Sequence, residues 1–114
     1  MIDFCVLGSG IAGSTIANLL SKKYSVHVFD KARGAGGRSS NKKLKGNLSF
    51  DHGVQYISPK SKVFAKITQK LFKKKILKTW DGNHLDFTFE KKSLTPKYIG
   101  VKANNALSKY YLKN

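Results

Sequence analysis

Cysteine, proline and acidic residues are all scarce in this sequence of 114 residues. The single cysteine, Cys5, excludes an internal disulfide and any metal site built from several thiolates. Its neighbours Phe4 and Val6 predict a small buried side chain in a strand, and a buried apolar thiol is poorly ionised, which argues against a redox role. Because the chain has no run of about 18 apolar residues, it predicts no membrane span.

The start of the chain also lacks a basic segment followed by an uninterrupted apolar stretch, so no secretory signal is predicted. We therefore expect a cytoplasmic protein. With 114 residues, of which 40% are apolar, the sequence has material for one compact domain at most.

Only six acidic residues stand against 22 basic ones, which gives a formal net charge of +16 at pH 7. Twenty of the basic residues are lysines, and they crowd between Lys60 and Lys78. Such a surface would attract nucleic acid or anionic lipid without sequence preference. The composition has two simpler explanations. Either the organism's proteins are all rich in lysine, or the sequence is a fragment of a longer protein whose acidic part is missing. We favour these explanations and expect no specific nucleic-acid partner, because arginine, the better residue for bidentate contacts, is nearly absent.

The first thirty residues carry a dinucleotide-binding pattern. Residues 2–7 predict a short parallel strand buried on both faces, and the motif Gly8-Ser9-Gly10-Ile11-Ala12-Gly13 follows. In such a motif the first glycine makes a sharp turn, the second lets the backbone approach a pyrophosphate, and the third lets helix and strand pack closely. A helical stretch and a second strand then lead to Asp30, expected to bind ribose hydroxyls. The predicted fold is α/β, with a Rossmann-type βαβ start.

A second glycine cluster follows at 34–37, with Arg38 directly behind it. Three glycines in four positions allow backbone conformations closed to other residues. Arg38 offers a fixed fork of donors to a phosphate or a carbonyl oxygen. A flexible linker is the simpler interpretation, but a linker would not require the arginine.

The remaining pattern predicts a β-hairpin insertion and two further helices. Residues 39–44 and 48–50 read as strands around a turn, and Ser58 with Pro59 predicts the start of a helix. The apolar stripe of that helix is most simply core or a domain contact. A hairpin over 76–90, a strand at 98–101 and an amphipathic helix from 103 to 113 complete the prediction. His52 reads as a hydrogen-bonding loop residue, since no second histidine or carboxylate stands at metal-ligand spacing.

Three blocks together resemble FAD-dependent oxidoreductases of the renalase-like, amine-oxidase-related group. They are residues 8–13, residues 29–38 and residues 50–56, and the stretch 98–107 is similar to the segment that leads into the next helix of that group. The resemblance spans nearly the whole chain. Its most specific part is the Gly-Gly-Arg loop just after the acid, which separates these flavoproteins from ordinary nicotinamide dehydrogenases.

The resemblance implies roles for residues along the length of FAD. The backbone around the pyrophosphate would come from Gly8, Ser9, Gly10, Ile11, Ala12 and Gly13. Around the adenosine half would lie Asp30, Lys31 and Arg33. Near the diphosphate and the ribityl chain would lie Gly37, Arg38 and Ser39. Towards the isoalloxazine ring would lie Gly53, Val54, Gln55 and Tyr56. The group often has Glu at the position of Asp30, so a bidentate ribose contact is less secure here.

Members of the group have several hundred residues, so the resemblance implies that residues 1–114 are the N-terminal part of an FAD-binding domain. The substrate domain would be absent, the later helices would lack apolar partners, and the chain would be inactive unless another chain completes it. In the intact family a hydride passes from a reduced nicotinamide, NAD(P)H, or from an amine to FAD, and oxygen reoxidises the flavin. No side chain in the sequence is a clear candidate for a catalytic acid, base or nucleophile. An NAD(P)-dependent dehydrogenase fragment and a basic nucleic-acid-binding or interaction module remain as alternatives.

Overall fold

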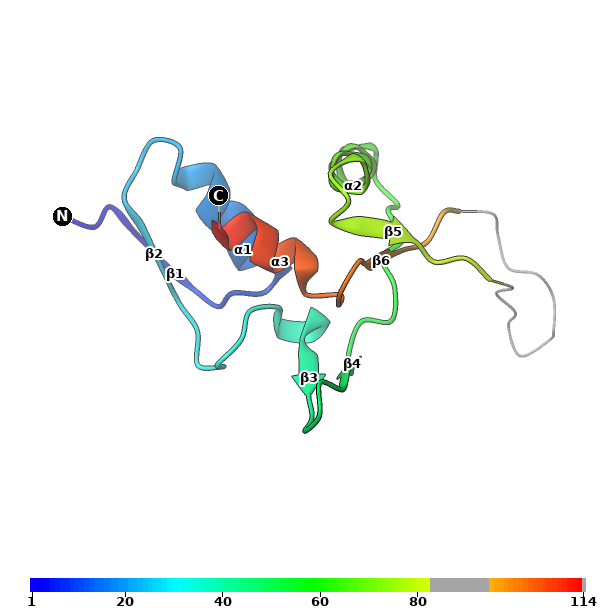
Figure 1. Ribbon diagram of the computed structural model, residues 1–114. Helices are drawn as coiled ribbons and strands as arrows, with labels where there is room; N and C mark the ends of the chain where they lie inside the picture. Colours follow the sequence, from blue (N-terminus) through cyan, green and yellow to red (C-terminus); the bar gives the residue numbers. More distant parts are fainter. Residues whose placement is uncertain (83–94, 114) are drawn as a thin grey trace.

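The computed structural model describes residues 1–82 and 95–113 and begins with the predicted βαβ unit (Figure 1). Strand β1 (Phe4–Leu7) leads into helix α1 (Ile11–Leu20), and strand β2 (Val26–Phe29) returns parallel to β1. The register pairs Phe4 with Val26 and Leu7 with Phe29. Both strands therefore end at the same edge, where the glycine turn and Asp30 follow. The α/β fold class and the Rossmann-type start are confirmed.

The prediction that β1 is buried on both faces is wrong for the described residues. Only Val6 of this strand is half-buried, whereas Leu7 is 81% exposed and Cys5 is exposed as well. In Figure 1, α1 and α3 (Ala106–Lys113) lie on one side of the β1–β2 pair, and no described element lies on the other side. A two-stranded sheet with one covered face cannot bury a strand that is apolar at nearly every position.

The middle of the chain forms the predicted β-hairpin, which begins after a short 3-10 helix, η1 (Gly37–Ser39). Strands β3 (Asn41–Lys43) and β4 (Ser49–Asp51) are antiparallel and pair Asn41 with Asp51. The turn between them contains two residues in the left-handed region, Gly46 and Asn47, residue types that tolerate this conformation. The hairpin extends away from the helices in Figure 1, and its register sets Asp51 opposite Asn41, two residues after η1.

Helix α2 (Lys62–Lys73) begins later than predicted. Its N-cap is Ser61, whose hydroxyl accepts a hydrogen bond from the backbone N–H of Phe64 at 3.1 Å, so Ser58 and Pro59 lie outside the helix. Both serines fit an N-cap, but only Ser61 lies three residues before an amide that the helix leaves unpaired. The apolar stripe does contribute to the core, because Leu71 is fully buried.

Strand β5 (Leu77–Thr79) pairs antiparallel with β6 (Tyr98–Gly100), which the sequence predicted as a separate short strand. The other half of the hairpin predicted over 76–90 lies outside the described residues. Around β5 and β6 five buried side chains, each from a different segment, form the core: Ile57, Leu71, Leu77, Tyr98 and Leu107. This core is separate from the β1–β2 pair and lies between α2 and α3.

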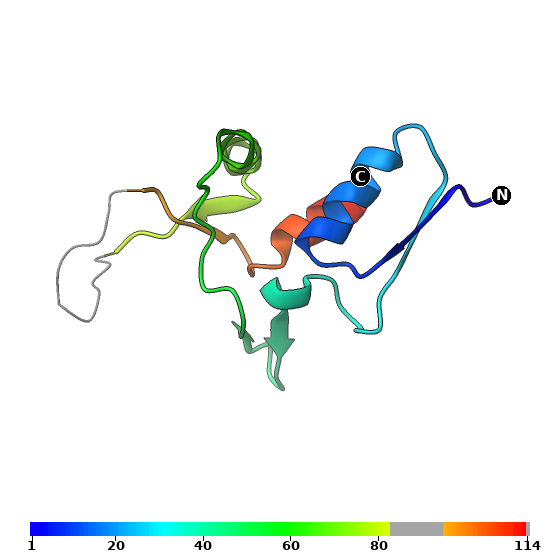
Figure 2. The same ribbon diagram turned by 180° about the vertical axis from the view of Figure 1, so that it is seen from behind.

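Helix α3 has partners, contrary to the prediction that the later helices lack them. It lies beside α1 in both views of the ribbon (Figures 1 and 2), and the side-chain amide of Asn18 on α1 donates to the carbonyl oxygen of Tyr111 at 3.1 Å. Leu107 is 1% exposed. The α1–α3 contact joins residues about ninety positions apart, and no local pattern could predict it. Among the described residues, no helix is long and apolar enough to cross a membrane.

Candidate dinucleotide site

The glycine turn after β1 adopts the geometry that a dinucleotide motif requires. Gly8 has φ +94°, a conformation that favours glycine, and its N–H donates to the carbonyl oxygen of Phe29 at 2.7 Å. The α-carbon of Gly13 faces the carbonyl oxygen of Gly8, so that a methyl group on Gly13 would overlap this oxygen. The first and third glycines therefore serve the turn and the close packing of α1 on β1, as the spacing predicts.

Asp30 holds this turn from the end of β2. One carboxylate oxygen, Oδ2, accepts hydrogen bonds from the backbone N–H of Ser9 at 2.6 Å and from the hydroxyl of Ser9. The other, Oδ1, accepts from the N–H of Ala32 at 2.8 Å. These bonds, led by the one from the Ser9 hydroxyl, lower the pKa of Asp30 from 3.8 to about 2. The predicted ribose ligand is thus also a support of the glycine turn, and Oδ1 keeps one lone pair for an outside donor.

The start of α1 is open to an anion. Gly10 occupies the N-cap position and provides no side-chain cap, and the first turn carries no acidic residue. The residue at the N-cap therefore offers no side-chain acceptor to the first N–H groups of the helix. Such a helix start, with the positive end of the helix dipole, favours an anionic ligand such as a phosphate group.

The second glycine cluster packs directly against the first. The N–H of Gly36 donates to the carbonyl oxygen of Ser9 at 3.0 Å, and Gly36 and Gly10 form a parallel bridge. Both Gly36 and Gly37 have positive φ, +133° and +54°. A methyl group on Gly37 would lie 3.2 Å from the α-carbon of Gly10. The two glycine segments, about 26 positions apart, thus form a single cradle at the N-terminus of α1.

The third sequence block joins the cradle through the backbone of Arg38. The carbonyl oxygen of Arg38 accepts the N–H of Val54 at 2.9 Å, and Gly53 is so close that a methyl group there would overlap it. The side chain of Arg38 itself is exposed. Ser39 is buried, and its hydroxyl donates to the carbonyl oxygen of Gly36 at 2.8 Å, so this hydroxyl supports the loop.

Beyond Val54 the chain presents an aromatic surface. Tyr56 stacks on Trp80 with ring centroids 5.2 Å apart, and the ammonium of Lys97 lies 4.7 Å from the centroid of the Tyr56 ring. Gln55 is exposed beside it. The family resemblance implied that Tyr56 lies near a flavin ring, but the sequence gave no reason to pair it with Trp80, which is 24 positions away.

Two asparagines that the sequence did not single out as site residues hold these loops in place. Asn104 donates through Nδ2 to the carbonyl oxygens of Val54 at 2.7 Å and Gln55 at 3.1 Å, and its Oδ1 accepts the N–H of Gly100. Asn105 donates to the carbonyl oxygen of Ala35 in the glycine loop at 3.2 Å. Both are buried. Their position just before α3 suggests only helix capping, so the sequence carries no signal of this role.

An open hollow of about 530 Å³ lies beside Asp30, at the ends of β1 and β2. Its lining combines apolar and charged residues: Leu7, Gly8, Phe29, Asp30 and Lys31. Leu7 and Phe29 are 81% and 54% exposed, an arrangement that suits the walls of a site for a flat base. Arg33 is exposed on the loop that follows.

The structure thus brings the first block to the second through Ser9 and Asp30, and the second to the third through Arg38 and Val54. The Nε2 of His52 lies 3.0 Å from the hydroxyl of Ser40, just before β3, as expected for a loop residue that makes hydrogen bonds. Within residues 1–82 and 95–113 no group of three or more histidines, cysteines and carboxylates is placed to hold a metal ion.

Residues 6–71 match the family model described as the NAD(P)-binding Rossmann-like domain, which is more than half of the chain. Among solved structures, the chain is similar to putrescine oxidase in a study of redesigned cofactor binding. A double mutant of that enzyme aligns with a TM-score of 0.55 and 25% identity over 82% of this chain. The wild type bound to putrescine aligns with a TM-score of 0.55 and 24% identity, also over 82%. In both cases the chain covers 21% of the solved chain, about one fifth of its length.

Proposed function

This chain belongs to the NAD(P)-binding Rossmann-like domain family, and on that premise we propose that it binds FAD for a flavin-dependent oxidoreductase of the renalase-like, amine-oxidase-related group. One observation carries the proposal: the loop 34–37 folds onto the glycine turn, with the N–H of Gly36 bonded to the carbonyl oxygen of Ser9. A nicotinamide dehydrogenase needs only the first glycine turn and the acid. The second loop and Arg38 supply the additional backbone and charge that the longer FAD molecule can use.

The residues of the site fit FAD. The uncapped start of α1 and the exposed Arg38 can bind the pyrophosphate. The hollow lined by Leu7, Phe29 and Lys31 has the size and the apolar walls that adenosine needs. Oδ1 of Asp30 can accept one ribose hydroxyl, because its other lone pair and both of those on Oδ2 are already occupied.

At the flavin end, Gln55 and Tyr56 are exposed and can contact the isoalloxazine ring. When bound, FAD supplies a hydride acceptor for a reduced nicotinamide or an amine and passes the electrons on to oxygen. The residues of the chain itself would position FAD and supply charge around its phosphates. We assign none of them as a catalytic acid, base or nucleophile. Because the chain covers about one fifth of the solved oxidases, we propose that it is the N-terminal part of the FAD-binding domain and that a complementing chain provides the substrate pocket.

The experiment is a titration of the purified full chain with FAD and, separately, with NAD⁺. We expect FAD to bind and to show a shifted visible spectrum. Gly10→Ala should weaken binding about tenfold, because its methyl group takes the space of the pyrophosphate. The same methyl lies 3.8 Å from the α-carbon of Gly37, an ordinary contact, so the fold is preserved. Gly34→Ala, whose methyl would meet nothing within 4 Å, is the matched control.

Binding of NAD⁺ with no flavin spectrum would favour the dehydrogenase alternative. Equal FAD affinity in the Gly10→Ala and Gly34→Ala variants would contradict binding of the pyrophosphate in the cradle.

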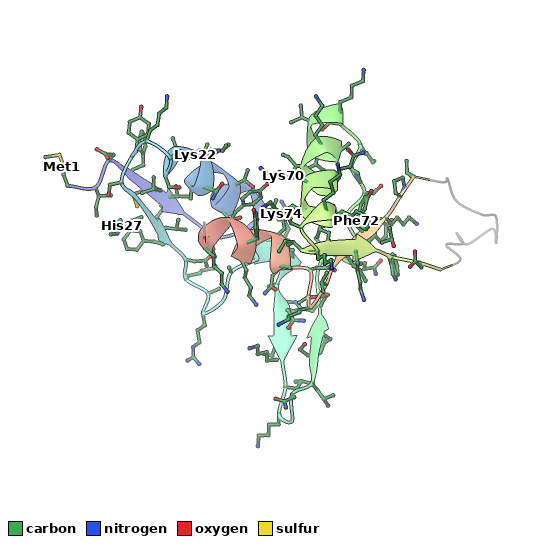
Figure 3. All side chains as sticks on the ribbon, turned by 45° about the horizontal axis from the view of Figure 1, so that its top comes forward. Met1, Lys22, His27, Lys70, Phe72 and Lys74 are labelled. Carbon is green, nitrogen blue, oxygen red and sulfur yellow. The ribbon has the colours of Figure 1, made fainter. Side chains whose placement is uncertain are left out.

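A second candidate function rests on the lysine face of α2. The lysines of this helix are exposed, and Figure 3 labels Lys70 together with Lys74, which directly follows the helix. No acidic residue occurs between His52 and Trp80 in the sequence. Such a face attracts polyanions through counterion release. Binding to single-stranded DNA that falls steeply with salt and survives Arg38→Ala would support this function. Binding that ignores salt would exclude it.

A further inference from the structure

A cavity separate from the glycine cradle lies where the end of α2, the turn after β6 and the start of α3 meet. Its volume is about 300 Å³, at the lower end of the range of small-ligand pockets. It is lined by Lys75, Ile76, Val101, Lys102, Ala103, Asn105, Ala106, Lys109, Tyr110 and Lys113. None of these residues belongs to the set assigned to FAD. We propose that this cavity binds a small organic anion with an apolar or aromatic body.

The chemistry of the lining determines that class of ligand. Four of the lining residues are exposed lysines, and no aspartate or glutamate is among the lining residues. Like charges gathered around one opening raise the local potential, which an anion relieves. Ile76, Val101 and the ring of Tyr110 provide apolar surface that an inorganic ion would leave unused. The ligand therefore needs both a negative group and an apolar body.

The backbone of Lys75 is the second observation. Its φ is +58°, a left-handed conformation that a side chain disfavours. The N–H of Lys75 donates to the carbonyl oxygen of Phe72 at 2.9 Å, and that of Ile76 donates to Leu71 at 3.0 Å. This is the Schellman ending of a helix, in which glycine is the usual residue at the position of Lys75. A residue in an unfavourable conformation that lines a charged cavity suggests that its side chain is kept for binding.

The test uses the full chain and the fluorescent probe anilinonaphthalene sulfonate, an aromatic body with one negative charge. Its neutral counterpart, N-phenylnaphthylamine, has the same body without the sulfonate. We expect one tight sulfonate site per chain and much weaker binding of the neutral compound. Lys109→Glu should weaken sulfonate binding about tenfold, because a cation at the rim becomes an anion.

Lys75→Gly should also weaken sulfonate binding without lowering the thermal midpoint, since glycine accepts the left-handed conformation. This second variant separates loss of binding from loss of folding. Lys66→Glu is the matched control. Lys66 lies on α2 and does not line the cavity, but its substitution makes the same charge change as Lys109→Glu.

Equal losses in Lys66→Glu and Lys109→Glu would show general attraction to a basic protein and would overturn the proposal. Equal affinity for the neutral compound, or sulfonate binding unchanged in both Lys75→Gly and Lys109→Glu, would overturn it too. Sulfonate binding at this cavity is independent of FAD binding, so Gly10→Ala should leave the affinity for the sulfonate unchanged.

Discussion

Asp30 accepts hydrogen bonds from both the backbone N–H and the hydroxyl of Ser9, across 21 positions of sequence. These bonds exist only in the folded chain and favour the charged carboxylate, so the pKa of Asp30 falls from 3.8 to about 2. A lowered folded-state pKa stabilises the fold above the unfolded value, and this contribution is lost as the pH falls from 3.8 to about 2.

We therefore expect Asp30→Asn to flatten the dependence of the free energy of unfolding on pH in this window. Urea unfolding at several pH values measures the slope. Asp3→Asn is the control, because Asp3 also accepts a backbone N–H, from Ser25, but supports no glycine turn. A slope in Asp30→Asn equal to that of the parent would mean that Asp30 does not hold the turn.

Gly13 controls how closely α1 packs on β1. In Gly13→Ala the new methyl group would overlap the carbonyl oxygen of Gly8, so the helix must move away from the strand. We expect a loss of about 3 kcal/mol in the free energy of unfolding, at the upper end of overpacking effects. Gly34→Ala introduces the same methyl group into open space and should leave stability nearly unchanged. Denaturant unfolding of both variants measures this difference, and equal stability would refute the close packing.

The side chain of Asn104 joins the segment 54–55 to strand β6. Asn104→Ala removes the bonds to the carbonyl oxygens of Val54 and Gln55 and to the N–H of Gly100. We expect it to reduce the free energy of unfolding by about 3 kcal/mol, since each of the three net hydrogen bonds contributes on the order of 1 kcal/mol. Asn41→Ala removes one exposed bond to Asp51 and should cost far less. Equal effects of the two substitutions on the unfolding midpoint would argue against this role of Asn104.

Cys5 reports whether the open face of the β1–β2 pair is covered. Its exposure predicts that a maleimide labels the native chain at nearly the rate found in denaturant. If a complementing chain supplies the rest of the domain, adding it should slow the labelling. Slow labelling of the chain alone that becomes fast on dilution would instead indicate that two copies cover this face for each other.

The sequence predicted those parts of the fold that depend on local spacing. The βαβ start follows from the glycines at 8, 10 and 13, and the β3–β4 hairpin from its turn residues. The same reasoning failed for burial: an apolar strand predicts a covered sheet, but the described residues put helices on one face only, so Leu7 and Cys5 are exposed. It also missed Asn104 and the packing of α3 on α1, because contacts across 50 to 93 positions leave no trace in local periodicity.

The hydrogen bond from Asn105 to Ala35 has a kinetic consequence. It spans 70 positions, and the bond from Asn104 to Val54 spans 50. The entropy of closing such long loops must be overcome before these contacts stabilise anything, so they form late in folding. The βαβ unit can nucleate from its own short-range contacts, whereas the cradle gains its support only after α3 has docked. A chain released from synthesis before residue 104 would hold the glycine motif without the geometry that makes it a site.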